Sequence, residues 1–539
     1  MSLLENTTRR RLRGTTAPPR SLGRVALAVG LVLGLGSCVT RPAPPLSTVY
    51  ERETAAEVFS VGFEGIADFY IEAIPMEALS AAALDGVSTL DPELNYVRRG
   101  DRLIVTVGGT PFADFRTPEP NDVARWAMLT SAAIDAGRYR SQILRDTSPE
   151  HIYQAAFDST VRKLDRFSRY SGRDKAQSER ASRNGYSGIG VTIGIENERV
   201  WVTSVFPNSP ATDAGLETAD RIVAVDGVSI AGLDLNGIAN RLRGPTGSHV
   251  ELTIERNEVL SNKAVERRRV IQETVELKLI GQVAYLHLSG FNRDTVASLR
   301  RAIDSAERTL GEKPAGLILD MRQNRGGILN QAAEVADVFI DQGTILETRG
   351  RHRKSAQLFE AEHLDALVDV PMVVVVDSGS ASAAEVVAAA LQDSGRALLI
   401  GARSYGKGTV QQIVSLPNNG ELILTWARMH APSGYALSTY GVFPSVCTAN
   451  AAENPTAMLA ALRAGTVRPG DAVHRRRVID TLDPARREAL GQWCRANHPP
   501  RSDDADTEIA LRLLGDRALF QQAFNASRIA LGQRPATIN

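Results

Sequence analysis

At 539 residues the chain is long enough for two to four domains, and its 62 basic residues balance 62 acidic ones. The resulting formal net charge of zero argues against a nucleic-acid partner and offers no electrostatic steering of a charged ligand. The sequence holds no Cys-x-x-Cys motif and no Cys/His cluster, so it predicts no metal site, and we expect no cofactor.

Residues 1–37 are predicted to be a signal peptide. An arginine-rich segment without acidic residues precedes the apolar stretch Val25–Gly36, which is too short to cross about 30 Å of hydrocarbon as a helix. The small residues before Cys38 resemble a bacterial lipoprotein signal, with Cys38 as the lipidated first residue of the mature protein. An ordinary signal peptide is the alternative. We expect a periplasmic, lipid-anchored protein of the bacterial cell envelope, with residues 38–49 as a tether.

Residues 50–182 are predicted to form a helical N-terminal domain with one strand, Asp101–Val107. A weak internal repeat runs through this domain, in which residues 83–96 parallel residues 156–170. Each copy has a helix, then a turn that begins with aspartate, then an aromatic residue. The match needs one gap, so a chance similarity is the alternative.

Residues 183–275 are predicted to form a unit of short strands, because apolar positions alternate and turn signals separate them. The expected strands are Ile189–Ile195, Val200–Val205, Arg221–Val225 and His249–Ile254, and the expected helix is Leu233–Leu242. The glycine-rich turn 187–191, together with residues 207–215 and 219–227, resembles a PDZ domain.

In a PDZ domain the N–H groups of a glycine-rich turn hold the carboxylate of a peptide, and the following strand pairs with that peptide. The resemblance therefore implies peptide binding by Gly188, Ile189, Gly190 and Val191. The alternative is that Gly188 and Gly190 only make a turn. A dinucleotide-binding loop is excluded, because the GxGxxG spacing is absent and no helix follows.

Residues 276–450 alternate predicted strands with predicted helices, which is typical of an α/β layer. The expected strands are Val283–Leu288, Gly316–Asp320, Met372–Val376, Ala397–Gly401 and Glu421–Thr425, and the expected helices are Asp294–Ala306, Leu329–Phe339 and Ala381–Gln392. The loop Asp320–Gly327 lies at the carboxyl end of a strand, where such proteins build their sites. Residues 451–539 are predicted to be a helical C-terminal extension that caps or extends this unit.

The stretch 371–412 gathers the side chains with the most chemistry. Ser380 and Ser382 lie where a buried strand meets a helix, whose free N–H groups and dipole favour negative charge. Lys407 follows on a loop between two glycines. Taken alone, the serines are equally readable as helix caps and the lysine as a solvated cation. A P-loop is excluded because Gly408 replaces the required Ser or Thr, and no histidine lies in a recognisable catalytic motif.

This stretch resembles the carboxyl-terminal processing (tail-specific) peptidases, which are serine proteases with an embedded PDZ domain. The matching motifs are Gly379–Glu385, Leu391–Asp393 and Tyr405–Gln411, with Arg322–Gly327 upstream and Pro432–Pro444 downstream. The resemblance extends from about residue 150 to Val446. It implies a multidomain α/β protein whose PDZ domain, residues 183–275, precedes a crotonase-like catalytic domain, residues 276–450. It also implies serine-type endopeptidase activity.

Carried onto this sequence, the resemblance implies that Ser382 is the nucleophile, Lys407 the general base and Gln411 the residue that orients the lysine. A lysine suits this role only when it is neutral, because a charged amine cannot accept the proton of the serine. Burial lowers a lysine pKa from about 10.4, and values of about 7–8 suit a general base near neutral pH.

The resemblance also implies an oxyanion hole formed by the backbone N–H groups of Ala383 and of the loop that holds Gly326 and Gly327. Gln323 and Arg325 stand where the family more commonly has asparagine and proline. This departure leaves open which glycine N–H contributes.

The expected substrates are polypeptides with accessible C-termini, and the resemblance leaves an adaptor protein and a homo-oligomer open. Two other functions also stay open: a non-catalytic PDZ scaffold or ligand-binding protein on a protease-like fold, and an esterase or amidase that uses the same dyad. If Cys38 is lipidated, Cys447 and Cys494 either form a disulfide or stay unpaired.

Overall fold

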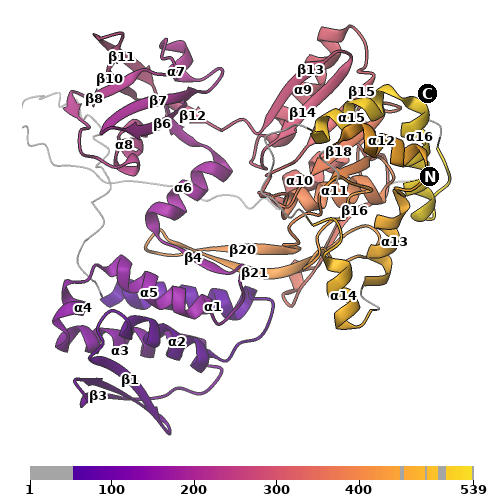
Figure 1. Ribbon diagram of the computed structural model, residues 1–539. Helices are drawn as coiled ribbons and strands as arrows, with labels where there is room; N and C mark the ends of the chain where they lie inside the picture. The colour runs from indigo at the N-terminus through magenta and orange to yellow at the C-terminus, as the bar shows by residue number, and fades with distance from the viewer. Residues whose placement is uncertain (1–51, 450–453, 480–481, 496–504, 537–539) are drawn as a thin grey trace, which may run out of the picture. The chain divides into compact units, whose positions relative to one another are not determined.

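The computed structural model describes residues 52–449, 454–479, 482–495 and 505–536 (Figure 1). The predicted signal peptide, the predicted tether and Cys38 lie outside these residues. The described chain combines helices with several sheets, and its fold is multidomain α/β, as predicted. Within the described ranges, no helix is both long and apolar enough to span a membrane.

The N-terminal region is mostly helical, with a small sheet that the sequence predicted only in part. Its helices are α1 (Arg52–Phe69), α2 (Met76–Ser88), α3 (Val123–Arg140), α4 (Gln142–Asp146), α5 (Pro149–Val161) and α6 (Arg173–Asn184). Its antiparallel strands are β1 (Leu94–Arg99), β2 (Arg102–Val107) and β3 (Thr110–Arg116). Only β2 was predicted. The turns at 100–101 and 108–109 contain glycine and make the two-residue hairpins that such turns favour.

The two copies of the weak repeat have the same local structure. In the first, α2 is followed by a turn in which Asp91 Oδ1 accepts the N–H of Glu93 at 3.0 Å, and then by β1. In the second, α5 is followed by a turn in which Asp165 Oδ1 accepts the N–H of Phe167 at 2.6 Å, and then by β4 (Arg169–Ser171). The two aspartates thus make the same Asx turn.

The PDZ-like region contains a sheet in the order β11-β10-β8-β7-β6, with β9 beside β8. Its elements are β6 (Val191–Glu196), β7 (Arg199–Val205), α7 (Pro210–Asp213), β8 (Arg221–Val225), β9 (Val228–Ser229), α8 (Leu235–Leu242), β10 (His249–Arg256) and β11 (Val259–Glu266). The four predicted strands and the predicted helix are confirmed within two residues at each end. The sequence analysis missed β11. A separate pair, β5 (Tyr186–Gly188) with β12 (Arg268–Val270), closes this region.

The third region is built on a six-stranded sheet in the order β13-β14-β15-β18-β19-β22. The strands are β13 (Val275–Ile280), β14 (Val283–Leu288), β15 (Gly316–Asp320), β18 (Met372–Val376), β19 (Leu398–Gly401) and β22 (Val446–Cys447). All run parallel except β13, which pairs with β14 as an antiparallel hairpin. Every residue of β15 and β18 is buried, because helices cover both faces of the sheet.

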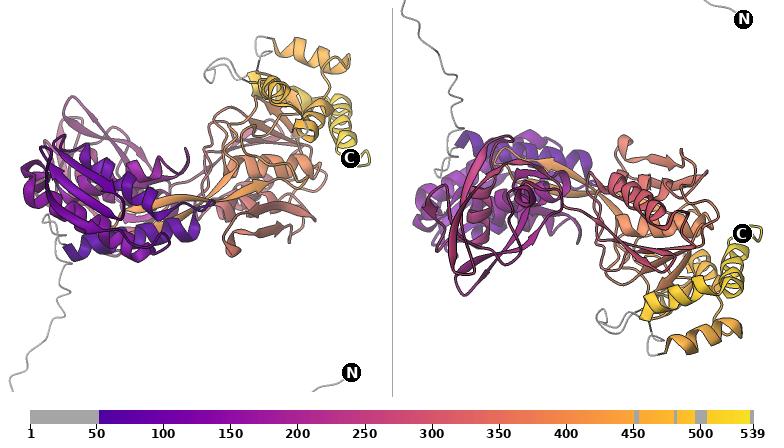
Figure 2. Two further views of the ribbon diagram at one scale, coloured as in Figure 1. Left: turned by 90° about the horizontal axis from the view of Figure 1, so that it is seen from below. Right: turned by 90° about the horizontal axis from the view of Figure 1, so that it is seen from above.

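Alternate residues of β18 contribute to two separate cores. Val374 and Val376 belong to the core formed with α9 (Thr295–Leu310), α10 (Leu329–Asp337) and α11 (Ala383–Asp393). Val373 and Val375 belong to the core formed with α12 (Pro455–Arg463), α15 (Ala505–Gly515) and α16 (Arg517–Ala530). Figure 2 shows these C-terminal helices, in yellow, gathered on one side of the sheet. The C-terminal helices therefore cover a face of the sheet that would otherwise be exposed.

A second sheet has the order β17-β16-β21-β20. Its strands are β16 (Thr344–Arg349), β17 (Gln357–Glu360), β20 (Thr409–Ser415) and β21 (Glu421–His430). The strand β4 of the N-terminal region pairs with β21. The buried carboxylate of Glu421 accepts bonds from Arg180 at 3.0 Å and Arg183 at 2.8 Å. The β20–β21 hairpin is therefore shared between the N-terminal region and the third region.

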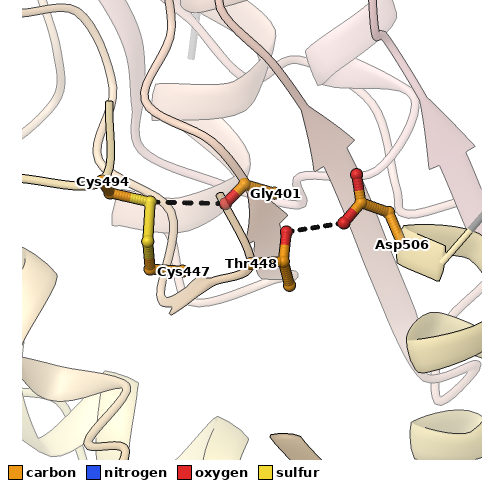
Figure 3. Close-up of a disulfide and its surroundings, with 5 residues drawn as sticks. All are labelled: Gly401, Cys447, Thr448, Cys494 and Asp506. Atoms are coloured by element: carbon orange, nitrogen blue, oxygen red, sulfur yellow. Dashed lines mark hydrogen bonds between the residues drawn. A yellow bond between two sulfur atoms is a disulfide. The ribbon is translucent and has the colours of Figure 1, made fainter. Parts of the chain in front are cut away.

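A disulfide joins Cys447 of β22 to Cys494, which follows α14 (Pro484–Gly491), across 47 residues (Figure 3). The sequence left this pairing open. The carbonyl of Cys494 accepts the N–H of Arg403 at 2.8 Å. Cys494 thus connects the segment after α14 to the sheet edge through the disulfide and to the loop after β19 through this hydrogen bond.

Removal of this disulfide by a Cys447→Ser/Cys494→Ser double substitution is expected to destabilise the protein by about 2–4 kcal/mol, because the unfolded chain loses a covalent constraint. Thermal unfolding with and without a thiol reductant measures this effect. The wild-type Tm should fall on reduction, whereas the Tm of the double variant should not respond to the reductant. An equal response of both proteins would contradict the expectation.

Candidate active site

Three loops meet at the carboxyl edge of the six-stranded sheet, where parallel strands β15, β18 and β19 end. Backbone hydrogen bonds join these loops. Ala381 N–H donates to the Asn324 carbonyl at 2.9 Å, and Tyr405 N–H donates to the Ser380 carbonyl at 3.0 Å. This edge of a parallel sheet is where α/β proteins place their sites. The motifs that the sequence singled out at 322–327, 379–385 and 405–411 are therefore adjacent in the fold.

Ser382 lies at the start of α11, half-buried, with φ 60° and ψ −116°. Residues other than glycine rarely adopt such a backbone conformation. It persists only where the surroundings impose it, which is common at active sites. The Ser382 N–H donates to Glu385 Oε2 at 2.7 Å. The first N–H groups of a helix lack intrahelical acceptors, so Ser382 lies beside donors that favour developing negative charge.

The neighbouring serines have other roles. Ser380 is fully buried, and its hydroxyl donates to the Met321 carbonyl at 2.8 Å while accepting the Asp377 N–H at 2.9 Å. Ser378 is exposed in the turn before it. Ser380 thus holds two loops together with its hydroxyl already engaged. Of the three serines, Ser382 is the one whose position suits a nucleophile.

Lys407 lies on the loop between β19 and β20. Its backbone N–H donates to the same Glu385 Oε2 at 3.0 Å. The structure therefore brings the backbones of Ser382 and Lys407 to one carboxylate oxygen. The following Gly408 has φ 51°, and a Cβ there would lie 2.0 Å from Ser438 N, so this close approach requires glycine.

The Lys407 amine is half-buried beside the second copy of the N-terminal repeat. Its Nζ lies 5.9 Å from the centroid of the Phe167 ring. Burial and the positive charge of Arg169 lower the pKa of Lys407 to about 8, although the carboxylates of Glu385 and Asp165 oppose this shift. At pH 7 about a tenth of such a lysine is neutral, far more than of an exposed lysine, and the neutral amine is the form that a general base requires.

The sequence analysis did not identify Asp165, Phe167 and Arg169 as part of the site. The Asp165 turn is held against β21, because Thr425 Oγ1 donates to Asp165 Oδ1 at 3.2 Å. The available signal was the repeat, whose second copy holds these residues. Its lone aspartate turn has no recognisable chemistry, and a sequence separation of 242 residues between Asp165 and Lys407 gives no sign that the two lie near each other.

The predicted oxyanion loop lies directly against the serine. A Cβ built on Gly326, which has φ 95°, would lie 2.8 Å from Ser382 Cβ and 2.9 Å from Ala383 N. The N–H of Gly326 donates to Asn324 Oδ1 at 2.9 Å, so this donor is engaged within its own loop. Ala383, as the first residue of α11, has an N–H without an intrahelical acceptor. The geometry therefore favours Ala383 and Gly327 over Gly326 as donors.

A Gly326→Ala substitution is expected to lower the rate of peptide cleavage by about 10²–10³-fold, the typical loss when an oxyanion donor is displaced. Its methyl group would press on Ser382 and Ala383. The matched control is Gly343→Ala, because Gly343 has a similar φ of 98° but open space around its Cβ position. Steady-state kinetics on the two folded variants check this result. Equal losses in both variants would attribute the effect to backbone strain alone.

Gln411 lies on β20, and its side-chain Nε2 donates to Thr409 Oγ1 at 3.0 Å. The partner of Gln411 in this structure is therefore a threonine of the same strand. Its predicted role in orienting Lys407 stays a prediction, which requires the amide to exchange this partner for the lysine amine.

His430 on β21 pairs across the sheet with Glu347, and burial lowers its pKa. In the described ranges, no group of three His, Cys, Asp or Glu side chains is arranged to hold a metal ion.

In the PDZ-like region, the predicted peptide-binding residues span the turn that leads into β6. Gly188 pairs with Arg268 of β12, and Ile189 is buried in the core of this region. The last two, Gly190 and Val191, enter β6, which ends its sheet and contacts α8. An edge strand beside a helix is the geometry that accepts an extended peptide. Direct contact of these four residues with a peptide stays a prediction.

The fold and the site together define a serine peptidase with an embedded PDZ domain. Residues 282–447 match the model of peptidase family S41, and residues 201–256 match a PDZ domain. A carboxy-terminal-processing protease of Bartonella bacilliformis is 36% identical over 315 residues, which cover 57% of this chain and 72% of the relative. The chain therefore belongs to the carboxy-terminal-processing proteases of peptidase family S41.

Two further matches accompany these. A carboxyl-terminal-processing protease of Picosynechococcus sp. is 30% identical over 310 residues, covering 55% of this chain and 72% of the relative. A solved structure of a photosystem II D1 C-terminal processing protease shares 24% identity. It covers 68% of this chain and 92% of its own, with a TM-score of 0.34.

Proposed function

We propose that the protein is an exported serine endopeptidase that cuts polypeptides with a Ser382–Lys407 dyad after its PDZ domain has bound their C-termini. The observation that carries this proposal is that the backbones of Ser382 and Lys407 are bound to the same carboxylate, that of Glu385. A serine at a strained helix start and a lysine with a pKa of about 8 both donate their backbone N–H to Glu385 Oε2.

The chemistry follows from these residues. Neutral Lys407 takes the proton of the Ser382 hydroxyl, and the serine oxygen attacks the carbonyl carbon of the scissile peptide bond. The resulting oxyanion is stabilised by the N–H of Ala383 and by the loop of Gly327. The lysine then returns its proton to the leaving amine, and water releases the acyl group. In our proposal Gln411 orients the lysine during these proton transfers.

Substrate selection is proposed to rest on the free edge of β6. An incoming C-terminal segment would add to this edge as an extra strand, beside α8, while N–H groups of the Gly188–Gly190 turn hold its carboxylate. The backbone pairing tolerates many side chains, so an accessible C-terminus is the main requirement. The expected substrates are therefore proteins with unstructured tails.

The proposal includes export and a lipid anchor at Cys38, with the protein on the periplasmic side of a bacterial membrane. The disulfide between Cys447 and Cys494 supports export, because structural disulfides persist mainly in oxidising compartments. An adaptor protein and a homo-oligomer are compatible partners of such an enzyme. Mass spectrometry of the mature N-terminus would test the anchor, since an unmodified Cys38 or cleavage at another residue contradicts it.

Cleavage of one polypeptide tail in two chemical forms tests the activity and the recognition together. The tail is fused to a folded carrier and carries either a free C-terminal carboxylate or an amide. We expect a kcat/KM at least about tenfold higher for the free carboxylate. Equal rates would contradict C-terminal recognition. Peptide binding without turnover would indicate a scaffold, and turnover of small esters alone would indicate an esterase.

A further inference from the structure

Glu385, three residues after the proposed nucleophile, is a carboxylate that the proposed mechanism does not use. It is fully buried, at 0% exposure, in the first turn of α11. Its two oxygens accept four hydrogen bonds. The donors are the N–H groups of Ser382 at 2.7 Å, Lys407 at 3.0 Å and Gly406 at 2.6 Å, and the Ser404 hydroxyl at 2.6 Å.

These four donors come from two separate segments of the chain. The bond to Ser382 is the ordinary reach of a capping-box glutamate back to the residue that starts its helix. The other three bonds lead away from the helix to residues 404–407, which follow a different strand of the sheet. A capping role explains the first contact only. The remaining three require a further explanation, because burying a carboxylate is costly unless its partners compensate.

We infer that Glu385 is the positioning residue that fixes the distance between the nucleophile and the general base. The inference rests on the proposed dyad. One oxygen, Oε2, accepts the N–H of both Ser382 and Lys407, so their two backbone nitrogens cannot be farther apart than the sum of these bonds. The other oxygen, Oε1, holds Ser404 and Gly406. The loop that carries the lysine is thereby fastened to the residue that carries the serine.

The hydrogen-bond network around Glu385 extends beyond the four bonds that its carboxylate accepts. The Ser404 hydroxyl, which donates to Glu385, accepts the N–H of Val442 at 2.7 Å. Three of the four donors to Glu385 are backbone N–H groups, and they reach both of its oxygens, so a proton on either oxygen would compete with at least one of these bonds. Burial raises the pKa of the Glu385 carboxyl, and its hydrogen bonds oppose this rise. The ionised carboxylate is the form that can accept all four hydrogen bonds.

The carboxylate also acts on the lysine through its charge. The groups that act on the Lys407 amine are Glu385 from α11 and Asp165, Phe167 and Arg169 from the N-terminal region. The two carboxylates favour the charged amine, and Arg169 disfavours it. Removal of the Glu385 charge would therefore make Lys407 easier to deprotonate. A residue that only supported the fold would not have this effect.

The first experiment compares Glu385→Gln with the wild type in the full-length protein, using the free-carboxylate tail substrate. We expect kcat to fall at least about 100-fold with KM changed less than about threefold, since PDZ binding is untouched. The residual activity should persist to lower pH than in the wild type, because the acidic limb of its kcat/KM profile follows the more readily deprotonated lysine. Glu385→Asp should recover part of the lost kcat.

Glu421→Gln is the matched control, because Glu421 is also a buried glutamate, held by Arg180 and Arg183, yet it lies outside the proposed machinery. This variant should lose stability but keep nearly wild-type kcat per folded molecule. Ser404→Ala covers the case in which Glu385→Gln does not fold. It removes one donor from Oε1, and we expect kcat to fall about three- to tenfold with KM unchanged.

The outcomes separate this inference from the proposed function. If Ser382→Ala retains activity, the proposed dyad itself is wrong. If Ser382→Ala is inactive but folded Glu385→Gln stays within threefold of the wild type, only the positioning role is wrong. The role is also overturned if Glu385→Gln loses kcat without any shift of its pH profile, or if Ser404→Ala, tested alone, leaves kcat unchanged.

Discussion

Replacing Ser382 with alanine is expected to lower kcat/KM for a polypeptide tail by on the order of 10⁵-fold, without destabilising the protein. The substitution removes the attacking oxygen and leaves the backbone intact. Alanine keeps the N–H that donates to Glu385, so the start of α11 is preserved. Cleavage kinetics and thermal unfolding of the same preparation check both halves of this result.

For the neighbouring Ser380→Ala substitution we expect the opposite result, which is a loss of stability with the activity of the folded protein retained. The Ser380 hydroxyl donates to the Met321 carbonyl and accepts the Asp377 N–H, and all of these groups are buried. Its removal is expected to cost about 1–3 kcal/mol, because the buried Asp377 N–H loses its partner, while the Met321 carbonyl keeps the Asn324 N–H at 3.2 Å. The folded fraction should still cleave substrate. If Ser380→Ala were stable but inactive while Ser382→Ala stayed active, Ser380 and not Ser382 would be the nucleophile.

The strands of the PDZ-like region show both the strength and the limit of turn signals. The Asn197-Glu198 dipeptide is one of the turn signals of this region, and the structure places it between β6 and β7 with both φ angles positive. The same dipeptide recurs at Asn257-Glu258 with similar φ angles, between β10 and β11. The second dipeptide does not predict a hairpin by itself, because the exposed, polar β11 that follows it has little of the apolar alternation that marks a strand.

The sequence predicted that the chain after residue 451 is helical, but it did not predict where these helices pack. The all-apolar strand β18 indicates a sheet that is covered on both faces. Helices α9, α10 and α11 cover only one of these faces. Sequence periodicity cannot say which distant segment supplies the other. The structure assigns it to α12, α15 and α16.

The candidate site was predictable where it depends on local sequence. The Ser-x-x-Glu spacing of Ser382 and Glu385 is a capping-box signature, and it correctly indicates the start of α11. The three other donors to Glu385 depend on how the loop 402–408 folds back, which spacing does not specify. The contact of Phe167 with Lys407 also depends on the pairing of β4 with β21, which joins two distant segments.

Cleavage by the wild-type enzyme is expected to rise with pH and to reach half its maximal kcat/KM near pH 8. Only neutral Lys407 can accept the serine proton, and burial lowers its pKa to about 8. Lys407→Met should lower kcat/KM by at least about 10²–10⁴-fold, the usual contribution of a general base. Lys407→Arg should also be inactive, because a guanidinium does not deprotonate in this pH range.

The same shift in pKa predicts that the stability of the folded protein, like its activity, rises with pH. The folded-state pKa of Lys407 lies below that of an exposed lysine, about 10.4, so folding is penalised wherever the amine must stay charged. The penalty is fully present below about pH 8 and disappears as the pH rises toward 10.4. Lys407→Met should therefore have a higher Tm than the wild type at pH 7, and the difference should shrink by pH 10. An inactive variant that is also less stable at pH 7 would indicate instead that Lys407 is charged and paired in the resting enzyme.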